Sequence, residues 1–314
     1  MVKVYIDGQE GTTGLNIVRR LCKRSDMQLI TIEESLRKDA QERRKRIWEA
    51  DVVILCLPDE AAKESVQLAE GSTARILDAS TAHRTKSGWA YGFPELSKEH
   101  RDAIRNGIRV SVPGCHASGF AALVYPLVKA GVLQRDYPLA CHSITGYSGG
   151  GKKMIGDYEG SNRDSSHDSP RLYALAQSHK HLPEMQAVCS LWQAPIFSPI
   201  VADYYSGMVV SIPLHTRHLN DRLGKAAIHE IFQEHYQGES MIKVLPMEVE
   251  ESLDGFLPAN NLAGRDDMEI LITGNDDRLL LAARFDNLGK GASGAAVQCL
   301  NLMMGTDEFS GLIY

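Results

Sequence analysis

The first third of the chain alternates continuous apolar segments with amphipathic ones, and this alternation limits the fold more than any other feature. Apolar runs without a period of two indicate strands that are buried on both faces of a sheet. The intervening segments place apolar residues at helical spacing, as in residues 14–21. Parallel strands covered by helices on both faces form a doubly wound α/β architecture. The expected strands are residues 2–6, 27–32, 51–57, 75–78 and 108–112, and helices are expected at 37–49 and 59–70.

The pattern changes after about Pro138. Longer β-like runs appear, and the last two are joined by the turn-like residues 274–277, which predict a hairpin. This half of the chain therefore predicts an α+β domain with a more antiparallel sheet. Residues 289–304 have helical spacing, and we expect this helix to return to the first domain. The expected strands are residues 139–147, 208–215, 268–273 and 279–285.

A glycine-rich segment follows the first expected strand and opens the first expected helix. Its spacing is GxxGxxG, a variant of the dinucleotide-binding fingerprint. Glycine allows a tight turn and lets backbone amides approach a pyrophosphate, whose charge then lies at a helix N-terminus. The flanking strand and helix favour a nucleotide site over an ordinary turn. The expected cofactor-binding residues are Gly8, Gly11, Thr12, Thr13 and Gly14.

The residues after the second expected strand bear on which nicotinamide cofactor binds. Glu33 or Glu34 would accept a hydrogen bond from the ribose of NAD, whereas Ser35, Arg37 and Lys38 would hold the additional phosphate of NADP. Arg37 and Lys38 are equally compatible with the solvated start of a helix. From these residues the choice between NAD and NADP stays open.

Cys115 follows Pro113 and Gly114 at an expected strand-to-helix junction, ahead of the strongly helical residues 117–128. A cysteine there meets the positive end of the helix dipole, which stabilises thiolate over thiol. The other five cysteines lie in apolar strands or helices, where a buried small hydrophobic residue is the better interpretation. A packed turn residue is the alternative for Cys115. We favour a nucleophile of the kind that forms thioesters.

The segment His179-Lys-His181-Leu-Pro-Glu184 is the best candidate for the base that such a nucleophile needs. Histidine transfers protons near neutral pH, and a nearby carboxylate can fix its tautomer. Glu184 follows His181 by three residues, so we predict that His181 transfers the proton and His179 supports it. A His-x-His pair also suggests a metal, but no third ligand has matching spacing, so we expect none. His116, one helical residue after Cys115, should point elsewhere.

Two further segments have the composition of ligand-binding backbone. Residues 146–153 are too glycine-rich for a strand interior and end in two lysines. Residues 78–84 supply the hydroxyl of Ser80 and the guanidinium of Arg84 just after a strand, where ligands bind in doubly wound sheets. Surface loops without a ligand are the alternative for both segments.

Composition and net charge limit the classes of molecule that this protein is expected to bind. The net charge of −6 gives no general attraction to nucleic acid or to an anionic membrane, and no apolar run reaches membrane-spanning length. We therefore expect a small-molecule substrate, with no nucleic-acid or membrane partner. The six cysteines include no CxxC pair, and the start of the chain runs into a strand-like segment without an apolar leader. These features predict a reduced cytoplasmic protein.

Taken together, these motifs resemble the N-acetyl-γ-glutamyl-phosphate reductases of arginine biosynthesis, particularly their shorter form. The Cys115 segment combined with His179-x-His181-x-Pro-Glu184 is the specific part of the likeness, whereas the glycine loop alone is unspecific. The matching segments occur in the expected order over nearly the whole chain. They are residues 8–14, 78–84, 91–96, 113–116, 148–151, 179–184 and 286–296.

The resemblance implies a Rossmann-type domain, a catalytic domain like that of glyceraldehyde-3-phosphate dehydrogenase, and NADP as cofactor. It implies that Cys115 is the nucleophile and that Gly149 and Gly151 lie near the nicotinamide. The expected reaction is the NADPH-dependent reduction of N-acetyl-γ-glutamyl phosphate to the semialdehyde through a Cys115 thioester. The segment after the second strand lacks the Ser-Arg-Ser-like phosphate loop of the longer form. Ser80, Arg84 and Glu184 are the expected substrate-binding residues.

On this basis we expect a dinucleotide-binding domain of residues 1–116 with 287–314, and a catalytic and oligomerisation domain of residues 117–286. We expect a homodimer or homotetramer. Aspartate-semialdehyde dehydrogenase is the nearest alternative enzyme, and the His-x-His-x-Pro-Glu segment argues against it. A cofactor-binding regulator without catalysis is an alternative of another class, which an intact Cys115 with candidate bases disfavours.

Overall fold

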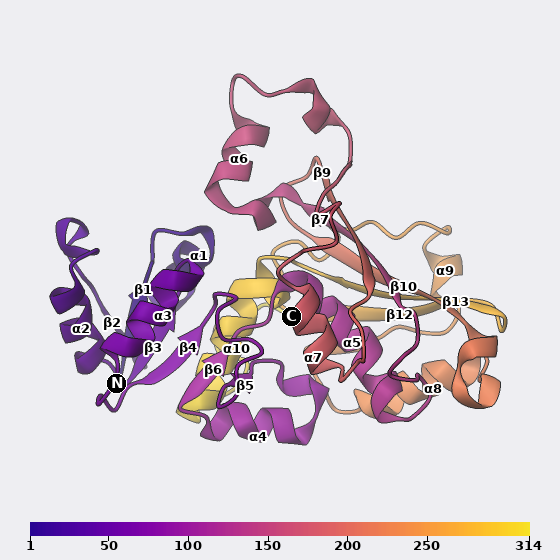
Figure 1. Cartoon of the computed structure of the whole chain (residues 1–314), viewed down its shortest axis with the longest axis horizontal. Helices are drawn as coiled ribbons and strands as arrows, with labels where there is room; N and C mark the ends of the chain where they lie inside the picture. The colour runs from indigo at the N-terminus through magenta and orange to yellow at the C-terminus, as the bar shows by residue number, and fades with distance from the viewer. The chain divides into compact units, whose positions relative to one another are not determined.

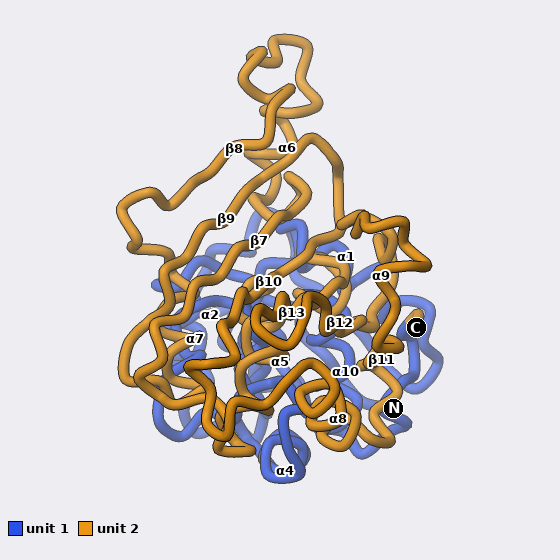
Figure 2. The backbone as a smooth tube through the Cα atoms, turned by 90° about the vertical axis from the view of Figure 1, so that its right-hand side faces the viewer, with its two compact units in different colours: residues 1–114, 292–312 blue, residues 115–291, 313–314 orange.

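A computed structural model describes residues 1–314. The backbone divides into two compact units (Figure 2). Unit 1 comprises residues 1–114 and 292–312, and unit 2 comprises residues 115–291 and 313–314. The C-terminal helix falls in unit 1, and Cys115 is the first residue of unit 2. No helix is both long and apolar enough to cross a membrane.

Unit 1 is built on a six-stranded sheet with the order β2-β1-β3-β4-β6-β5. Every paired neighbour is parallel, which confirms the predicted architecture. The strand order reverses between β1 and β3, and in such sheets the crevice beyond the carboxyl ends of these strands is where ligands bind. The strands are β1 (Val2–Asp7), β2 (Met27–Ile30), β3 (Val52–Leu55), β4 (Arg75–Asp78), β5 (Ala90–Tyr91) and β6 (Arg109–Ser111).

Helices cover both faces of this sheet, which is why its strands lack an alternating pattern. Along β1, Val4 and Ile6 join one apolar cluster, while Tyr5 joins the cluster on the opposite face. The first cluster includes residues of α1, α4 and α10, and the second includes residues of α2 and α3. The helices are α1 (Thr12–Leu21), α2 (Ala40–Glu49), α3 (Asp59–Leu68), α4 (Lys98–Asn106) and α10 (Gly294–Met304).

Two of the predicted helices begin differently from what their sequences predict. The helix expected from residue 37 begins at Ala40, because the side chain of Asp39 caps it by accepting hydrogen bonds from the amides of Gln41 and Glu42. A separate 3-10 turn, η1 (Glu34–Leu36), precedes it. The helix expected from residue 289 begins with a π-helical turn, η7 (Gly289–Ser293), and continues as α10.

Unit 2 contains a seven-stranded mixed sheet with the order β11-β12-β13-β10-β7-β9-β8. The predicted hairpin is confirmed, because β12 and β13 pair antiparallel. Between β7 and β8 the chain carries α6 beyond the end of the sheet (Figures 1 and 2). The strands are β7 (Ala140–Gly146), β8 (Arg171–Leu172), β9 (Ile196–Ala202), β10 (Met208–His215), β11 (Ile242–Val244), β12 (Met268–Gly274) and β13 (Arg278–Phe285).

Helix α5 (Cys115–Lys129) packs on the middle of this sheet. A Cβ atom at Gly119 would lie 2.5 Å from Val210 on β10 and 2.8 Å from Phe285 on β13, so the helix approaches both strands closely. Its interior is almost entirely buried, which fixes the N-terminal end that begins with Cys115. The other helices of unit 2 are α6 (Gly151–Glu159), α7 (Leu182–Val188), α8 (Lys225–His235) and α9 (Val249–Ser252).

Candidate active site

The glycine loop of unit 1 has the geometry that a phosphate cradle needs. Gly8 has φ +87°, and a Cβ atom there would clash with the carbonyl oxygen of Cys56. A Cβ atom at Gly14 would lie 2.6 Å from the carbonyl oxygen of Gly8. Helix α1 starts at Thr12 with no side chain capping its first amides. The loop thus presents open backbone donors at a helix N-terminus, which suits the pyrophosphate of a dinucleotide.

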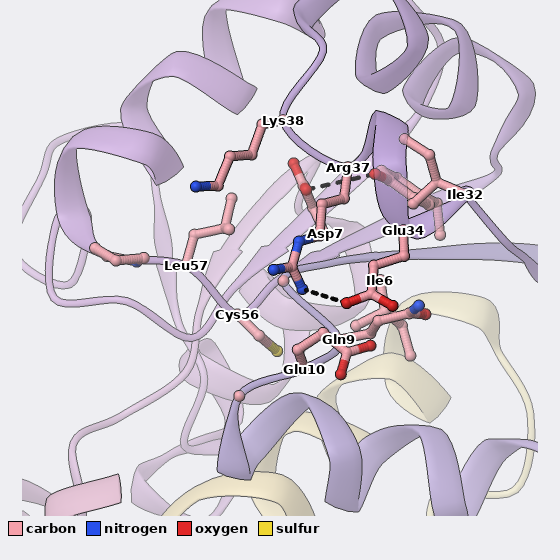
Figure 3. A pocket seen from close by; sticks show the side chains of 14 residues that line it. Ile6, Asp7, Gln9, Glu10, Ile32, Glu34, Arg37, Lys38, Cys56 and Leu57 are labelled. Carbon is pink, nitrogen blue, oxygen red and sulfur yellow. Dashed lines mark hydrogen bonds and ion pairs between the residues drawn. The ribbon is translucent and has the colours of Figure 1, made fainter. Parts of the chain in front are cut away.

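A pocket opens beside this loop, between the ends of β1 and β3 (Figure 3). Gly8 and Gly11 line it, and so does Arg37, whose guanidinium lies 3.6 Å from the carboxylate of Glu34. Thr12, Thr13 and Gly14 form the first turn of α1, and Ser35 lies in η1 between the lining residues Glu34 and Arg37. The lining residues are Tyr5, Ile6, Asp7, Gly8, Gln9, Glu10, Gly11, Ile32, Glu34, Arg37, Lys38, Cys56, Leu57 and Pro58.

Asp7, which lines this pocket, forms a buried ion pair with Arg43. The sequence does not predict this pair. The carboxylate of Asp7 accepts hydrogen bonds from Arg43 at 3.1 and 3.2 Å and from the hydroxyl of Ser65 at 2.7 Å. Arg43 also donates to Glu64 at 2.6 Å. These contacts tie β1 to α2 and α3 directly beneath the glycine loop. Asp7 directly precedes Gly8, but its partners lie far along the chain and carry no motif.

The predicted substrate-binding residues after β4 make structural contacts. The hydroxyl of Ser80 donates to the buried carboxylate of Asp78 at 2.8 Å, and His83 Nδ1 lies 2.6 Å from the same carboxylate. The guanidinium of Arg84 donates to the backbone carbonyls of Val112 and Ala79. These contacts order the loop at the carboxyl end of the sheet. Substrate binding by Ser80 and Arg84 stays a prediction.

Cys115 is the first residue of the 15-residue helix α5, so its sulfur lies at the positive end of the helix dipole. It is half-buried and forms no disulfide. The setting of three other thiols is different: burial raises the pKa of Cys56 to about 12 and also raises the pKa values of Cys141 and Cys189. Those three thiols keep their protons at neutral pH, whereas Cys115 begins a helix, which is an activating position. Cys299 is also buried, but Cys22 is exposed, so the expectation of burial is wrong for Cys22.

The segment that carries His179 and His181 is held near Cys115 by a turn at Gln177 and by hydrogen bonds from the Gln177 side chain. Gln177 has φ +53°, and its side-chain amide both donates to and accepts from the backbone of Phe197 on β9, at 2.7 and 2.8 Å. Ligand atoms of Cys115, His116 and His181 all lie within 4.8 Å of one another. His179 lies behind this group, with its Nδ1 accepting a hydrogen bond from the amide of His181 at 3.1 Å.

The prediction that His116 points elsewhere is wrong. Its ring is buried, and its centroid lies 5.5 Å from that of His179 and 5.5 Å from that of His181. The residues at 179–181 fold over the first turn of α5, so that consecutive residues of this turn face the same cluster. Burial, and to a lesser degree the nearby His179, lowers the pKa of His116 to about 3. His116 is therefore neutral at physiological pH.

Two residues that the sequence did not single out hold the ring of His116. Its Nδ1 lies 2.7 Å from the hydroxyl of Ser143 on β7, and its Nε2 lies 2.7 Å from the hydroxyl of Tyr173. Tyr173 follows the edge strand β8, and its amide donates to the carbonyl of Pro199 on β9. No motif surrounds Ser143 or Tyr173, so only the fold reveals them.

The remaining predicted residues of unit 2 lie in two places. Glu184 is buried in the first turn of α7. Gly149 belongs to the 3-10 turn η3 (Tyr147–Gly150), and Gly151 follows it with φ +72°. Asn287 holds this turn by donating to the hydroxyl of Ser148 at 3.0 Å. Contact of Gly149 and Gly151 with a nicotinamide stays a prediction.

The donor set at Cys115 is also one that a soft divalent metal accepts. One sulfur and two imidazole nitrogens, all within 4.8 Å of one another, correspond to the ligands that Zn²⁺ prefers. We expected no metal because no third ligand has a sequence spacing that matches His179 and His181. The three residues that could hold a metal are instead Cys115, His116 and His181, and local sequence spacing does not reveal this combination.

Comparison with known proteins agrees with this arrangement. Residues 27–104 match the family model "Semialdehyde dehydrogenase, NAD binding domain", and residues 115–287 match "Semialdehyde dehydrogenase, dimerisation domain". Among solved structures, an aspartate semialdehyde dehydrogenase II from Vibrio cholerae superposes with a TM-score of 0.72 at 14% identity, covering 97% of this chain and 99% of that one. The enzyme from Francisella tularensis gives 0.72 at 16%, over 97% and 100%. At these identities the likeness shows the fold.

Curated relatives are much more similar in sequence. A Nostoc protein named N-acetyl-gamma-glutamyl-phosphate reductase 2 is 45% identical over 99% of both chains. A Brucella ovis protein named N-acetyl-gamma-glutamyl-phosphate reductase is 45% identical over 96% of this chain and 99% of its own. This chain therefore belongs to the N-acetyl-γ-glutamyl-phosphate reductase family and has the two-domain semialdehyde dehydrogenase fold.

Proposed function

We propose that this protein reduces N-acetyl-γ-glutamyl phosphate to N-acetylglutamate semialdehyde and phosphate, through a thioester on Cys115. The observation that carries the proposal is the placement of Cys115 at the start of α5 against His116 and His181. The names of relatives that are 45% identical over nearly the full chain supply the substrate. The fold-level likeness to aspartate semialdehyde dehydrogenases supports the reaction class without bearing on the substrate.

The first half of the reaction uses Cys115 and His181. His181 takes the thiol proton, and the thiolate attacks the γ-carbonyl carbon of the acyl phosphate. A carbon–sulfur bond forms, the bond from carbon to the phosphate oxygen breaks, and phosphate departs with the electron pair. The helix dipole of α5 favours the thiolate before the attack. A thioester divides one difficult reduction into two accessible steps.

In the second half, NADPH would supply the hydride that reduces the thioester carbon. The tetrahedral oxyanion takes the proton that His181 holds. When the carbon–sulfur bond breaks, its electron pair returns to sulfur, and the hydroxyl proton returns to His181 as the aldehyde leaves. His179 supports this exchange by accepting the amide hydrogen bond that orients the backbone of His181.

The cofactor of this reaction is a nicotinamide dinucleotide, as the matching domain model indicates, and we propose that it is NADP. The glycine cradle and the open amides of α1 fit the pyrophosphate. Arg37 and Lys38 line the same pocket and would hold a 2′-phosphate, while Glu34 already neutralises part of the charge of Arg37. We also propose a cytoplasmic homodimer or homotetramer, supported by the dimerisation domain model and by six cysteines outside any disulfide.

A two-part experiment tests the proposal. First, phosphate-dependent oxidation of N-acetylglutamate semialdehyde and of aspartate semialdehyde is compared with NADP and with NAD. Efficient turnover of the N-acetylated substrate with NADP is expected, and preference for the aspartate substrate would overturn the assignment. Second, the protein is mixed with acyl phosphate without NADPH and analysed by mass spectrometry. An acyl adduct on Cys115, or free N-acetylglutamate from its hydrolysis, is expected.

A further inference from the structure

Asp7 places a negative charge in the pocket beside the glycine loop, where the dinucleotide would bind as an anion. It is the last residue of β1, it directly precedes Gly8, and its side chain lines the pocket (Figure 3). Only 3% of Asp7 is exposed, so water screens its charge poorly. A pyrophosphate on the glycine loop would be repelled by this carboxylate unless another group neutralises it.

The lining of the pocket does not balance this charge by itself. One of its two cations, Arg37, lies 3.6 Å from the carboxylate of Glu34. The lining residues therefore have an excess of negative charge, which is unfavourable for a phosphate group. The charged side chains of the lining are the three carboxylates Asp7, Glu10 and Glu34 and the two cations Arg37 and Lys38.

The balancing charge is that of Arg43 on α2, which is not among the lining residues. Its Nε and Nη2 atoms donate to one oxygen of the Asp7 carboxylate at 3.2 and 3.1 Å. Nη2 also donates to the hydroxyl oxygen of Ser65 at 2.6 Å, and this hydroxyl donates to the same carboxylate oxygen at 2.7 Å. Arg43 is only 5% exposed, so its charge is held beside that of Asp7.

We propose that Arg43 sets the affinity of the pocket for the dinucleotide by neutralising Asp7. Because it acts through Asp7, Arg43 is a positioning residue. The inference rests on the proposed binding of a nicotinamide dinucleotide, and it holds for NADP and NAD alike, since both carry the pyrophosphate. Arg43 also donates to Glu64 at 2.6 Å, but the side chain of Glu64 is 49% exposed and its charge is screened by water.

The same contacts have a mechanical effect, because they join β1 to α2 and α3. Breaking a buried ion pair on one side is costly for the fold, since it leaves an uncompensated charge. Charge neutralisation and a purely mechanical role differ when both charges are removed together. Removal of both restores dinucleotide binding if the charge matters, and it fails to do so if the pair only holds the fold.

The experiment measures the dissociation constants of NADPH and NADH by fluorescence titration of full-length variants, with the thermal unfolding temperature as a separate readout. Arg43→Met leaves Asp7 without its cation and should weaken binding of both cofactors by about tenfold to a hundredfold. Arg43→Lys keeps the charge and should stay within about threefold of the unmodified protein, although it loses the forked hydrogen bonds. The double variant Arg43→Met with Asp7→Asn has neither charge and should also stay within about threefold.

The matched control is Arg46→Met, which removes one positive charge from the same helix. Arg46 forms its ion pairs with Glu42 and Glu49 of α2, so this variant should change the dissociation constants by less than about twofold. Asp7→Asn alone should act in the opposite direction to Arg43→Met. It leaves the Arg43 charge beside the pocket and should tighten binding by about threefold to tenfold, even as the unfolding temperature falls.

The outcomes separate this inference from the proposed function. Failure of the unmodified protein to bind NADPH or NADH would contradict the proposed function itself. If the unmodified protein binds, the role of Arg43 is overturned by a double variant that loses more than about threefold in affinity, or by Asp7→Asn binding no more tightly than the unmodified protein. Neither comparison requires Arg43→Met alone to fold. An effect of Arg43→Met on NADPH without one on NADH would also overturn it, because the charge would then act on the 2′-phosphate.

Discussion

In the dinucleotide pocket of unit 1, the groups that would meet the pyrophosphate are backbone amides of one short loop. At Cys115 in unit 2, the chemically active groups are side chains that come from α5, β7 and the segment between β8 and α7. The loop depends on glycine, because any Cβ atom at Gly8 or Gly14 would collide with the backbone. The cluster depends on a turn that folds over the helix. Backbone geometry therefore determines the first site, and tertiary packing determines the second.

Replacing Cys115, the proposed nucleophile, should have the largest effect and should leave unit 1 unchanged. Serine at position 115 keeps the shape, but its hydroxyl is barely ionised at neutral pH. We predict that Cys115→Ser lowers turnover by about four orders of magnitude or more, while NADPH binds as before. Steady-state kinetics and a fluorescence titration with NADPH measure the two effects. Substantial turnover in this variant would end the covalent mechanism.

The two histidines should differ, because the structure brings His181 and not His179 into the group with Cys115. We predict that His181→Asn lowers kcat by about a hundredfold to ten-thousandfold, since it removes the proposed proton-transfer group, with unchanged affinity for NADPH. His179→Asn is the matched variant and should lose less, because it removes a support for the backbone. A greater loss of kcat in His179→Asn would reverse the two roles.

Substitutions at Gly8 and Gly11 test whether the backbone shape of the loop determines dinucleotide binding. We predict that Gly8→Ala weakens NADPH binding by about thirtyfold or more, since the added methyl collides with Cys56 and the φ of +87° is strained. At Gly11 a Cβ atom would meet ordinary contacts at 3.6 and 3.8 Å, so Gly11→Ala should preserve the loop and lose less affinity. Titration with NADPH measures both, and similar losses would show that the loop shape is not the determinant.

The glycine loop of unit 1 is recognisable from the sequence because its glycines, the strand before it and the helix after it are neighbours along the chain. One glycine spacing between a strand and a helix identifies the loop, and the strand β4 has the predicted bounds. Even here the buried pair of Asp7 and Arg43 was missed, because the two residues are 36 positions apart and share no pattern.

The unit 2 cluster is predictable only in part. Cys115 and the His-x-His segment carry recognisable patterns, so both were found. Ser143 and Tyr173 lie 27 and 57 positions from His116 and approach it only when β7 and β9 pair beside α5. The error about His116 has the same origin, because helical spacing says where a residue sits on its helix and says nothing of what folds over that helix.

The smallest predicted effect concerns the cations at the rim of the dinucleotide pocket. We predict that Arg37→Ala and Lys38→Ala each weaken NADP binding by about threefold to tenfold, with much smaller effects on NAD, because each contributes one exposed charge to a 2′-phosphate. Exposed charges are screened by salt, so the difference should shrink as ionic strength rises. The double variant of Arg44 and Lys45 to alanine is the control, because both residues are exposed on α2 outside the pocket lining and the change in net charge is the same.

Glu34, the ion-pair partner of Arg37, allows a second test of the cofactor preference. Glu34 lies 3.6 Å from the guanidinium and would face the same ribose edge, where a carboxylate favours the hydroxyl of NAD and repels the phosphate of NADP. Glu34→Gln should therefore strengthen NADP binding and weaken NAD binding, opposite in sign to the loss of Arg37. If the double variant of Arg37 and Lys38 loses NAD and NADP affinity equally, these cations act on the pyrophosphate or on the fold, and the cofactor preference must arise elsewhere in the pocket.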